Sequence, residues 1–208
     1  MGTLTLLRHV ESEWSALHRF AGSSDVPITR SGELAARALA SCIDGLDVGV
    51  VYVSGLQRAR QTLDAILDEL GRTNLPVIVE PALNERSFGV LEGLDKRDAK
   101  SKFGKADFAR WRSSFTQAPP QGESLAETAE RTRPVVLEKL LPAVRTGNNV
   151  LVVAHGDSLR TIIMTLEELT QEAVLGLRLQ PGELVFYSVS TDGSVRRRSG
   201  ATADTENR

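Results

Sequence analysis

The chain has 208 residues, of which 41% are hydrophobic and 25% are charged, and its formal net charge is −2. This length suits one well-buried α/β domain, and the composition is that of an ordinary globular protein. A net charge so close to zero provides no strong basic field, which argues against nucleic acid or an acidic membrane surface as the main partner. No apolar run approaches the roughly 20 residues that span a bilayer, and the start of the chain lacks a signal-peptide pattern, so we expect a cytoplasmic protein.

Apolar runs of β-favouring residues alternate with helical patterns along the chain. The predicted strands cover residues 3–7, 49–53, 76–80, 149–154, 183–189 and, more weakly, 194–198. The predicted helices cover residues 29–43, 56–70 and 124–139, and a fourth begins at Asp157 or Ser158. This alternation predicts a three-layer α/β sandwich, in which helices cover both faces of a mostly parallel sheet.

Three of these helices carry terminal signals. Thr29 or Ser31 is expected to cap the first helix, and Gly71 follows the second at the position of a C-terminal glycine. Ser124 and Glu127 have the spacing of a capping box at the start of the third helix.

No linker divides the chain, so we expect residues 1–198 to form a single domain. The stretch 84–122 has little strand pattern and is too long for a structureless connection, which predicts a partly helical insertion over the functional site. Residues 199–208 are polar, which predicts a mobile tail.

Two of the three histidines follow predicted strands directly. Arg8-His9 ends the first apolar run, and His155-Gly156 ends the run 150–154. Open α/β sheets bind ligands at the carboxyl ends of their strands. We therefore expect the two imidazoles to meet over one anion.

Two further charged residues also follow predicted strands. Arg58 lies in the first turn of a helix, and Glu85 lies in a turn-rich loop. A phosphate monoester needs cationic donors, a nucleophile and an acid for its leaving oxygen, and the helix beginning near Gly156 adds backbone N–H groups. Each residue alone has an ordinary structural explanation, but together they predict a phosphate-handling α/β enzyme without identifying its nucleophile.

Longer motifs surround these residues. They are Leu7-Arg8-His9-Val10-Glu11-Ser12, Gln57-Arg58-Ala59, Leu83-Asn84-Glu85-Arg86, Gly93-Leu94-Asp95-Lys96, Trp111-Arg112, Gly122-Glu123-Ser124-Leu125 and Ala154-His155-Gly156-Asp157. In these motifs the chain resembles the histidine phosphatase superfamily, and within it most closely the cofactor-dependent phosphoglycerate mutases, over about residues 3–190. The resemblance implies a phosphoglycerate mutase-like fold.

The resemblance also implies a role for each site residue. His9 would be the nucleophile that forms a phosphohistidine, and Glu85 would be the general acid and base. Arg8, Arg58 and His155 would bind the transferring phosphoryl group. The implied substrate-binding residues are Ser15, Gly22, Lys96, Arg112, Gly156 and Asp157.

The ligands that the resemblance implies are small. The partner would be a phosphorylated metabolite, and 2,3-bisphosphoglycerate would be the phosphoryl donor of a mutase. No metal would be required, because cationic side chains neutralise the phosphate charge. A homo-oligomer stays open, since mutases of this type are often dimeric or tetrameric.

The sequence departs from the mutase pattern at six positions near the site. Val10 replaces a glycine, Ser15 an asparagine, Ala21 a hydroxyl residue, Phe88 a tyrosine, Ser113 an arginine and Asp157 an asparagine. The last two changes shift the charge of the distal pocket by two units. We expect the loss of one charged hydrogen bond to weaken a bisphosphorylated ligand by about tenfold to a hundredfold, unless Arg60 or Arg110 compensates.

Three functions stay open. The first is a phosphoglycerate mutase that converts 3-phosphoglycerate to 2-phosphoglycerate through His9. The second is a phosphatase for a related phosphorylated sugar or acid, which the altered distal pocket favours. The third is a non-catalytic binding protein, which the joint presence of Arg8, His9, Arg58, Glu85 and His155 disfavours.

Overall fold

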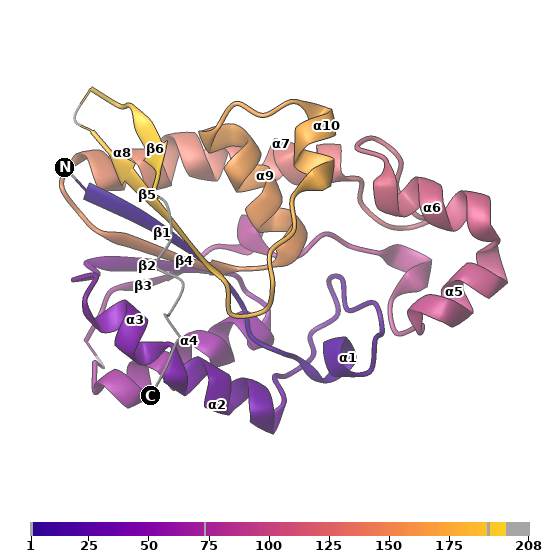
Figure 1. The fold of residues 1–208 in the computed structure, drawn as a ribbon, viewed down its shortest axis with the longest axis horizontal. Helices are drawn as coiled ribbons and strands as arrows, with labels where there is room; N and C mark the ends of the chain where they lie inside the picture. Colours follow the sequence, from indigo (N-terminus) through magenta and orange to yellow (C-terminus); the bar gives the residue numbers. More distant parts are fainter. Residues whose placement is uncertain (1, 73, 191, 199–208) are drawn as a thin grey trace, which may run out of the picture.

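The computed structural model describes residues 2–72, 74–190 and 192–198, and within them six strands form one sheet (Figure 1). The strands are β1 (Gly2–Arg8), β2 (Val50–Val53), β3 (Val77–Val79), β4 (Val150–Ala154), β5 (Leu184–Val189) and β6 (Val195–Arg197). Their order in the sheet is β3-β2-β4-β1-β5-β6. All six predicted strands are confirmed, and each end lies within one residue of its predicted position.

The four strands β3, β2, β4 and β1 run parallel, and β5 and β6 are antiparallel to their neighbours. In the register of β1 and β4, Arg8 lies opposite Ala154. The backbone N–H of His9 then donates to the Ala154 carbonyl over 2.9 Å. This pairing brings the residues that follow both strands, His9 and His155, to the same edge of the sheet.

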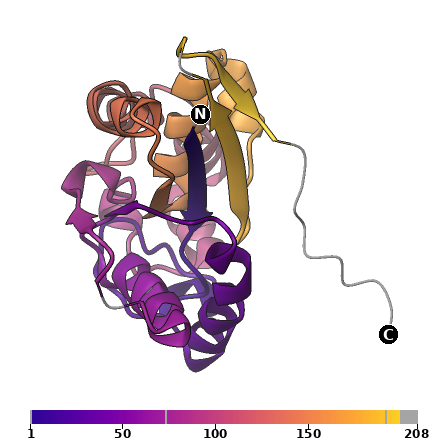
Figure 2. The same cartoon turned by 90° about the vertical axis from the view of Figure 1, so that its left-hand side faces the viewer.

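Helices cover both faces of the sheet, as the alternating pattern predicts. One face carries α2 (Arg30–Ala38), α3 (Ala40–Asp44) and α4 (Gln57–Leu70). The other carries α7 (Leu125–Pro134), a π-helical segment (Val135–Leu140), α8 (Leu141–Arg145) and α9 (Gly156–Leu166), followed by α10 (Gln171–Gly176). The two groups also lie on opposite sides of the strands in the perpendicular view (Figure 2).

The expected helix ends are largely confirmed. The Thr29 side chain accepts the Gly32 N–H at the start of α2, Ser124 and Glu127 form a capping box, and Gly71 ends α4 with φ of +63°. The predicted helix 29–43 is instead two helices, because the turn tightens at Leu39, whose N–H reaches both the Ala35 and Ala36 carbonyls. Neither glycine nor proline marks this break in the sequence.

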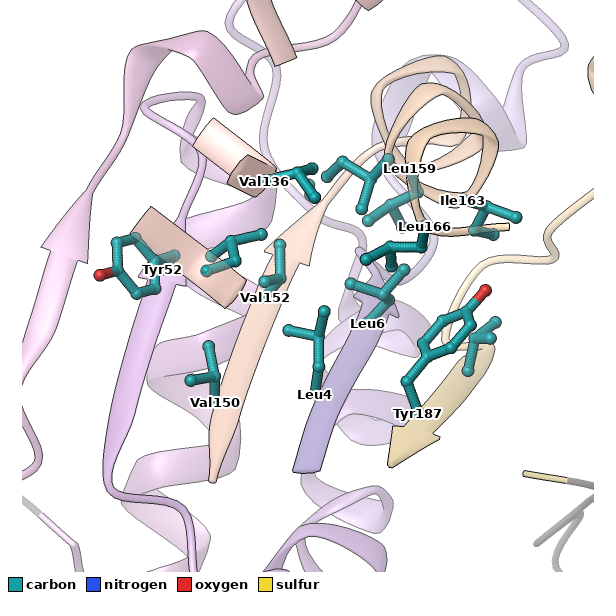
Figure 3. Close-up of a cluster of buried hydrophobic side chains, with 14 of the residues drawn as sticks. Leu4, Leu6, Tyr52, Val136, Val150, Val152, Leu159, Ile163, Leu166 and Tyr187 are labelled. Atoms are coloured by element: carbon teal, nitrogen blue, oxygen red, sulfur yellow. The ribbon is translucent and has the colours of Figure 1, made fainter. Parts of the chain in front are cut away.

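Alternate residues of each strand pack on opposite faces of the sheet. Leu4 and Leu6 of β1 belong to a buried cluster with Val150 and Val152 of β4 and residues of α9 (Figure 3). Leu7 belongs to a second buried cluster, with Val51, Val53, Leu151, Val153 and residues of α2 to α4. Burial on both faces accounts for the nearly continuous apolar runs and holds the strand ends rigidly in place.

The segment 84–122 carries a short 3₁₀ helix (Gly89–Leu91), α5 (Lys96–Phe103) and α6 (Lys105–Ser113). These helices lie beyond the end of β1 in Figure 1, and a small cluster of Phe20, Leu91, Ala99 and Phe108 joins them to the loop after β1. The predicted tail, residues 199–208, lies outside the described residues. Within the described ranges, no helix is long and apolar enough to cross a membrane.

Candidate active site

A cavity of about 320 Å³ lies at the carboxyl end of β1, between the sheet and the insertion. Ten of the eleven site residues that the sequence suggests line it: Arg8, His9, Ser15, Gly22, Arg58, Glu85, Lys96, Arg112, Gly156 and Asp157. The eleventh, His155, is fully buried beside His9, and the centroids of the two rings are 5.0 Å apart.

The His9 ring is held in one tautomer. Its Nδ1 lies 2.6 Å from the Val10 carbonyl, which can only accept a hydrogen bond, so Nδ1 carries the proton. The Nε2 atom of the neutral ring therefore keeps a lone pair. Burial, Arg58 and Arg8, in that order of effect, lower the pKa of His9 well below its usual value. The ring is thus neutral and nucleophilic near pH 7.

A chain of hydrogen bonds orients His155. Oδ1 of Asn84, which can only accept hydrogen bonds, accepts both the Gly55 N–H and the Ser54 hydroxyl proton. The Ser54 oxygen in turn accepts from Nε2 of His155 over 2.6 Å. The unprotonated Nδ1 is therefore the free atom of this ring. Burial and then Arg58 lower the pKa of His155 well below its usual value.

Four buried polar side-chain atoms have no hydrogen-bond partner among the described residues. They are Nε of Arg8, Oγ of Ser12, Nε of Arg58 and Nδ1 of His155. Buried polar groups are rarely left unpaired, and these four all belong to residues in or beside one cavity. Three of them are donors already and the fourth becomes one on protonation, so the cavity fits an anion with several acceptor oxygens.

Main-chain carbonyl groups fix the two arginines. Arg58, whose exposed fraction is 1%, donates to the Ser24 carbonyl over 2.8 Å and to the Gly22 carbonyl over 2.7 Å. Arg8 donates to the Leu179 carbonyl. Gly22 has φ of +53°, and a Cβ there would lie 2.2 Å from Oε1 of Glu92. Only glycine fits this turn, so Gly22 acts on the site by holding Arg58.

The Glu85 carboxylate lies at the N-terminus of α9. Its Oε1 accepts the N–H groups of Arg86 over 3.0 Å, Asp157 over 3.1 Å and Ser158 over 3.4 Å. Burial raises the pKa of Glu85, and the negative charge of Asp157 raises it further. A carboxyl group with a raised pKa is suited to general acid and base chemistry.

Gly156 keeps space open between Glu85 and Arg8. A Cβ on Gly156 would lie 3.6 Å from Oε2 of Glu85 and 3.7 Å from Cζ of Arg8. A side chain here would fill the volume that the acid and the guanidinium share.

The Asp157 carboxylate pairs with two arginines to which the sequence analysis assigned no role. Its Oδ2 lies 2.8 Å from Nε of Arg86, and its Oδ1 lies 2.6 Å from Nη1 of Arg160. Burial acts to raise the pKa of Asp157, but the two guanidiniums outweigh it and lower the pKa. The negative charge that Asp157 adds is therefore paired with two guanidinium groups.

The outer part of the cavity is cationic and partly apolar. Lys96 and Arg112 come from α5 and α6, and burial of the ammonium group together with Arg112 and Arg8 lowers the pKa of Lys96. Arg19 and Arg178 line the same cavity and were missed in the sequence, since loop arginines resemble ordinary solvated charges. The apolar lining residues are Phe20, Ala21, Phe88, Leu177 and Leu179.

Several expectations about the departures from the mutase pattern change. Val10 does not line the cavity: it packs in the core with an exposed fraction of 1%. The Ser15 hydroxyl bonds the Ser12 backbone at the start of α1 (Glu13–Ala16), with both distances 2.8 Å. The exposed Ser113 hydroxyl donates to the Ala109 carbonyl and does not line the cavity.

The proposed compensation by Arg60 or Arg110 does not occur. Arg60 borders a separate groove beside β3, and Arg110 pairs with Asp107 on the surface of α6 over 2.6 Å. His18 is exposed outside the cavity, where its carbonyl accepts the Lys96 N–H. In the part of the chain that the structure describes, no group of three or more His, Cys, Asp or Glu side chains is arranged to hold a metal ion.

Two bacterial proteins resemble this chain in sequence. The chain is 42% identical over 198 residues to the 2,3-bisphosphoglycerate-dependent phosphoglycerate mutase of Afipia carboxidovorans, covering 94% of this chain and 96% of the relative. It is 42% identical to the protein of the same name from Rhizobium etli, covering 93% of each.

Solved structures give a second comparison. The mycobacterial glucosyl-3-phosphoglycerate phosphatase in complex with VO3 superposes with a TM-score of 0.84 at 26% identity, over 95% of this chain and 98% of the other. A protein described as mycobacterial hydrolase 1 has a TM-score of 0.83 at 25% identity, over 95% and 96% of the two chains. The family model of the histidine phosphatase superfamily (branch 1) matches residues 4–201, and the chain therefore belongs to this superfamily.

Proposed function

We propose that the protein transfers phosphoryl groups through a phosphohistidine on His9, and that it acts as a phosphoglycerate mutase on 3-phosphoglycerate and 2-phosphoglycerate. The observation that carries the proposal is the set of four unpartnered buried atoms around the neutral His9 ring. Such an arrangement suits a phosphoryl group with three non-bridging oxygens. The names of the relatives at 42% identity support the mutase as the specific activity.

The first half of the reaction follows from the tautomer of His9. Nε2 attacks the phosphorus while the bond from phosphorus to the substrate oxygen breaks, and Glu85 gives its proton to that oxygen. Arg8 and Arg58 neutralise the charge on the transferring group. Protonated on Nδ1, His155 becomes a further donor, because an incoming dianion favours its charged form.

The second half reverses the roles. Glu85, now ionised, takes a proton from a substrate hydroxyl, whose oxygen attacks the phosphorus as the bond to Nε2 of His9 breaks. A mutase requires that water be kept from the phosphohistidine during this exchange. The two halves together restore the protonation of both residues.

The cavity also fits the phosphoryl donor that the relatives' names imply. The unpartnered atoms suit one phosphate, and Lys96 and Arg112 suit a second anionic group at the other end of a short ligand. Arg8, Arg58, Lys96 and Arg112 would therefore hold 2,3-bisphosphoglycerate, which when bound supplies the phosphoryl group for His9. We place the reaction in the cytoplasm, and a homo-oligomer stays a prediction.

A phosphatase is the second candidate. Phe88 and Ala21 line the cavity without the hydroxyl groups that the mutase pattern has at these positions, and Ser113 brings no charge to it. A less polar outer wall suits a larger phosphate ester, and the solved structure of a glucosyl-3-phosphoglycerate phosphatase has the same fold. Water would then take the phosphoryl group from His9, with Glu85 as the base.

One assay with two readouts tests these alternatives. Purified protein receives 3-phosphoglycerate and a trace of 2,3-bisphosphoglycerate, and both 2-phosphoglycerate and free phosphate are followed. The mutase predicts rapid isomerisation with little phosphate released. Phosphate release without isomerisation would favour the phosphatase instead. If neither product forms and the sample behaves like a His9→Ala blank, the protein is a binding protein.

A further inference from the structure

Asp157 lies in the first turn of α9 between two guanidinium groups, and little of this cluster is exposed. The exposed side-chain fractions are 5% for Arg86, 13% for Asp157 and 11% for Arg160. Each carboxylate oxygen has its own guanidinium partner, at 2.8 and 2.6 Å. Both oxygens of Asp157 are thus engaged by arginine side chains. We name this arrangement the Arg86–Asp157–Arg160 clamp.

The clamp connects separate parts of the molecule around the cavity. Arg86 also donates to the Trp111 carbonyl, in α6, and to the Glu123 carbonyl before α7. Arg160 donates to the Val174 carbonyl of α10 through Nε over 3.1 Å and Nη2 over 2.8 Å. Asp157 is the shared member of both sets.

Backbone N–H groups from two segments of the chain, the loop after Glu85 and α9, hold the Glu85 carboxylate. Arg86 follows Glu85 in the chain, and its N–H donates to the Glu85 carboxylate. From α9, the Asp157 and Ser158 N–H groups donate to the same carboxylate oxygen. Fixing Arg86 against Asp157 therefore fixes both groups of donors relative to Glu85.

The charges that face Glu85 come from four elements. Arg8 is the last residue of β1, Arg58 comes from α4, Asp157 comes from α9, and Arg86 follows Glu85 on the same loop. The two imidazoles of His9 and His155 nearby are neutral. Asp157 is thus the one negative charge named among these neighbours, and a neutral residue in its place leaves only guanidiniums around the acid.

We propose that Asp157 is a positioning residue, which holds Arg86 and Arg160 as a buried clamp, fixes the Glu85 carboxyl group against α9 and balances the charge around it. The inference rests on the proposed role of Glu85 in phosphoryl transfer. It also gives a function to the aspartate that replaces the asparagine of the mutase pattern: the aspartate acts on the acid.

Substitutions of Asp157 and of Arg160 are expected to shift the pKa of Glu85 in opposite directions. Asp157→Asn keeps the shape of the side chain but removes its negative charge, so the pKa of Glu85 falls. Arg160→Gln removes one positive charge and leaves Asp157 ionised beside Arg86, so the pKa of Glu85 rises. The matched control is Asp107→Asn, which breaks the ion pair between Asp107 and Arg110 on the surface of α6, outside the cavity.

The direct test is a ¹³C NMR titration of the glutamate side-chain carboxyl groups in the full chain, with the Glu85 signal assigned from a Glu85→Gln sample. We expect the midpoint of Glu85 to move to lower pH in Asp157→Asn, to higher pH in Arg160→Gln, and to stay in place in Asp107→Asn. Unchanged midpoints, or shifts in the same direction for both arms, would overturn the proposal. Should Asp157→Asn fail to fold, the upward shift in Arg160→Gln still decides the question.

The pH dependence of kcat with 3-phosphoglycerate separates this inference from the proposed function. If Glu85 is the acid, the alkaline limb of the profile moves with the titration midpoint in each variant. Shifted midpoints with an unmoved limb would keep the clamp and reject Glu85 as the acid. A lower kcat in both Asp157→Asn and Arg160→Gln, with an unchanged titration midpoint of Glu85, would leave the clamp a purely structural role and reject our proposal.

Discussion

The inner wall of the cavity consists of side chains that follow sheet strands, whereas the outer wall consists of side chains from the insertion and from the loop before β5. The inner residues are buried, and main-chain carbonyls or neighbouring side chains hold them in fixed directions. Lys96, Arg112 and Arg178 of the outer wall are exposed. The difference indicates that the inner wall performs the chemistry and the outer wall selects the ester.

The largest expected effect is at the inner wall. His9→Ala removes the nucleophile and should lower kcat by about three orders of magnitude or more with every phosphate ester. Steady-state assays with 3-phosphoglycerate and with an aryl phosphate check this. His18→Ala, at an exposed histidine outside the cavity, is the control and should behave as the wild type. Equal losses in the two variants would contradict the assignment.

Glu85→Gln should follow, with kcat lower by roughly 10²- to 10⁴-fold for 3-phosphoglycerate. The alkoxide that leaves this substrate needs a proton, and glutamine cannot supply one. An aryl phosphate with a good leaving group needs less help, so its loss should be much smaller. The ratio of the two losses is the measurement, and similar losses for both esters would show that Glu85 does not act as the acid.

A smaller and more selective effect is expected at the outer wall. Lys96→Met should raise KM for 3-phosphoglycerate roughly tenfold, because one charged contact to the distal anionic group is lost. KM for an aryl phosphate, which lacks this group, should hardly change. Lys100→Met, at an exposed lysine of α5 outside the cavity, is the matched control. A uniform rise for both esters would mean that the two walls are not separate in function.

The smallest effect concerns stability. Burial, followed by Arg58, lowers the pKa of His9 and of His155 in the folded protein. Above the unfolded value of about 6.5 both states are neutral, and below it only the unfolded chain binds the protons, so stability falls as the pH drops. We expect a loss of roughly 1 kcal/mol for each ring between pH 7.5 and 5.5. Urea unfolding in phosphate-free buffer should show a smaller loss in His155→Gln than in the wild type.

The inner wall could be predicted from the sequence because each of its residues follows a recognisable feature. The apolar runs before His9 and His155 mark buried parallel strands, and the strand-end rule places both rings at one edge of the sheet. The glycine at Gly71 and the capping box at Ser124 likewise act through local geometry. These signals require no knowledge of distant partners.

The outer wall and the clamp depend on contacts between distant residues. Arg86 and Asp157 are 71 positions apart, and nothing local to Asp157 shows that two arginines neutralise it. In the sequence Arg19 and Arg178 resemble ordinary solvated charges, and only the fold shows that they line the cavity. For the same reason the two ion pairs of Asp157 could not be predicted from the sequence.

The phosphohistidine itself tests the central claim most directly. The protein is mixed with 2,3-bisphosphoglycerate, quenched within milliseconds at alkaline pH, and digested for peptide mapping of acid-labile phosphate. Our account predicts phosphate on His9, absent in His9→Ala and still formed in Lys96→Met at a higher donor concentration. Turnover of phosphate esters without any phosphate on His9, or with phosphate on another residue, would contradict it.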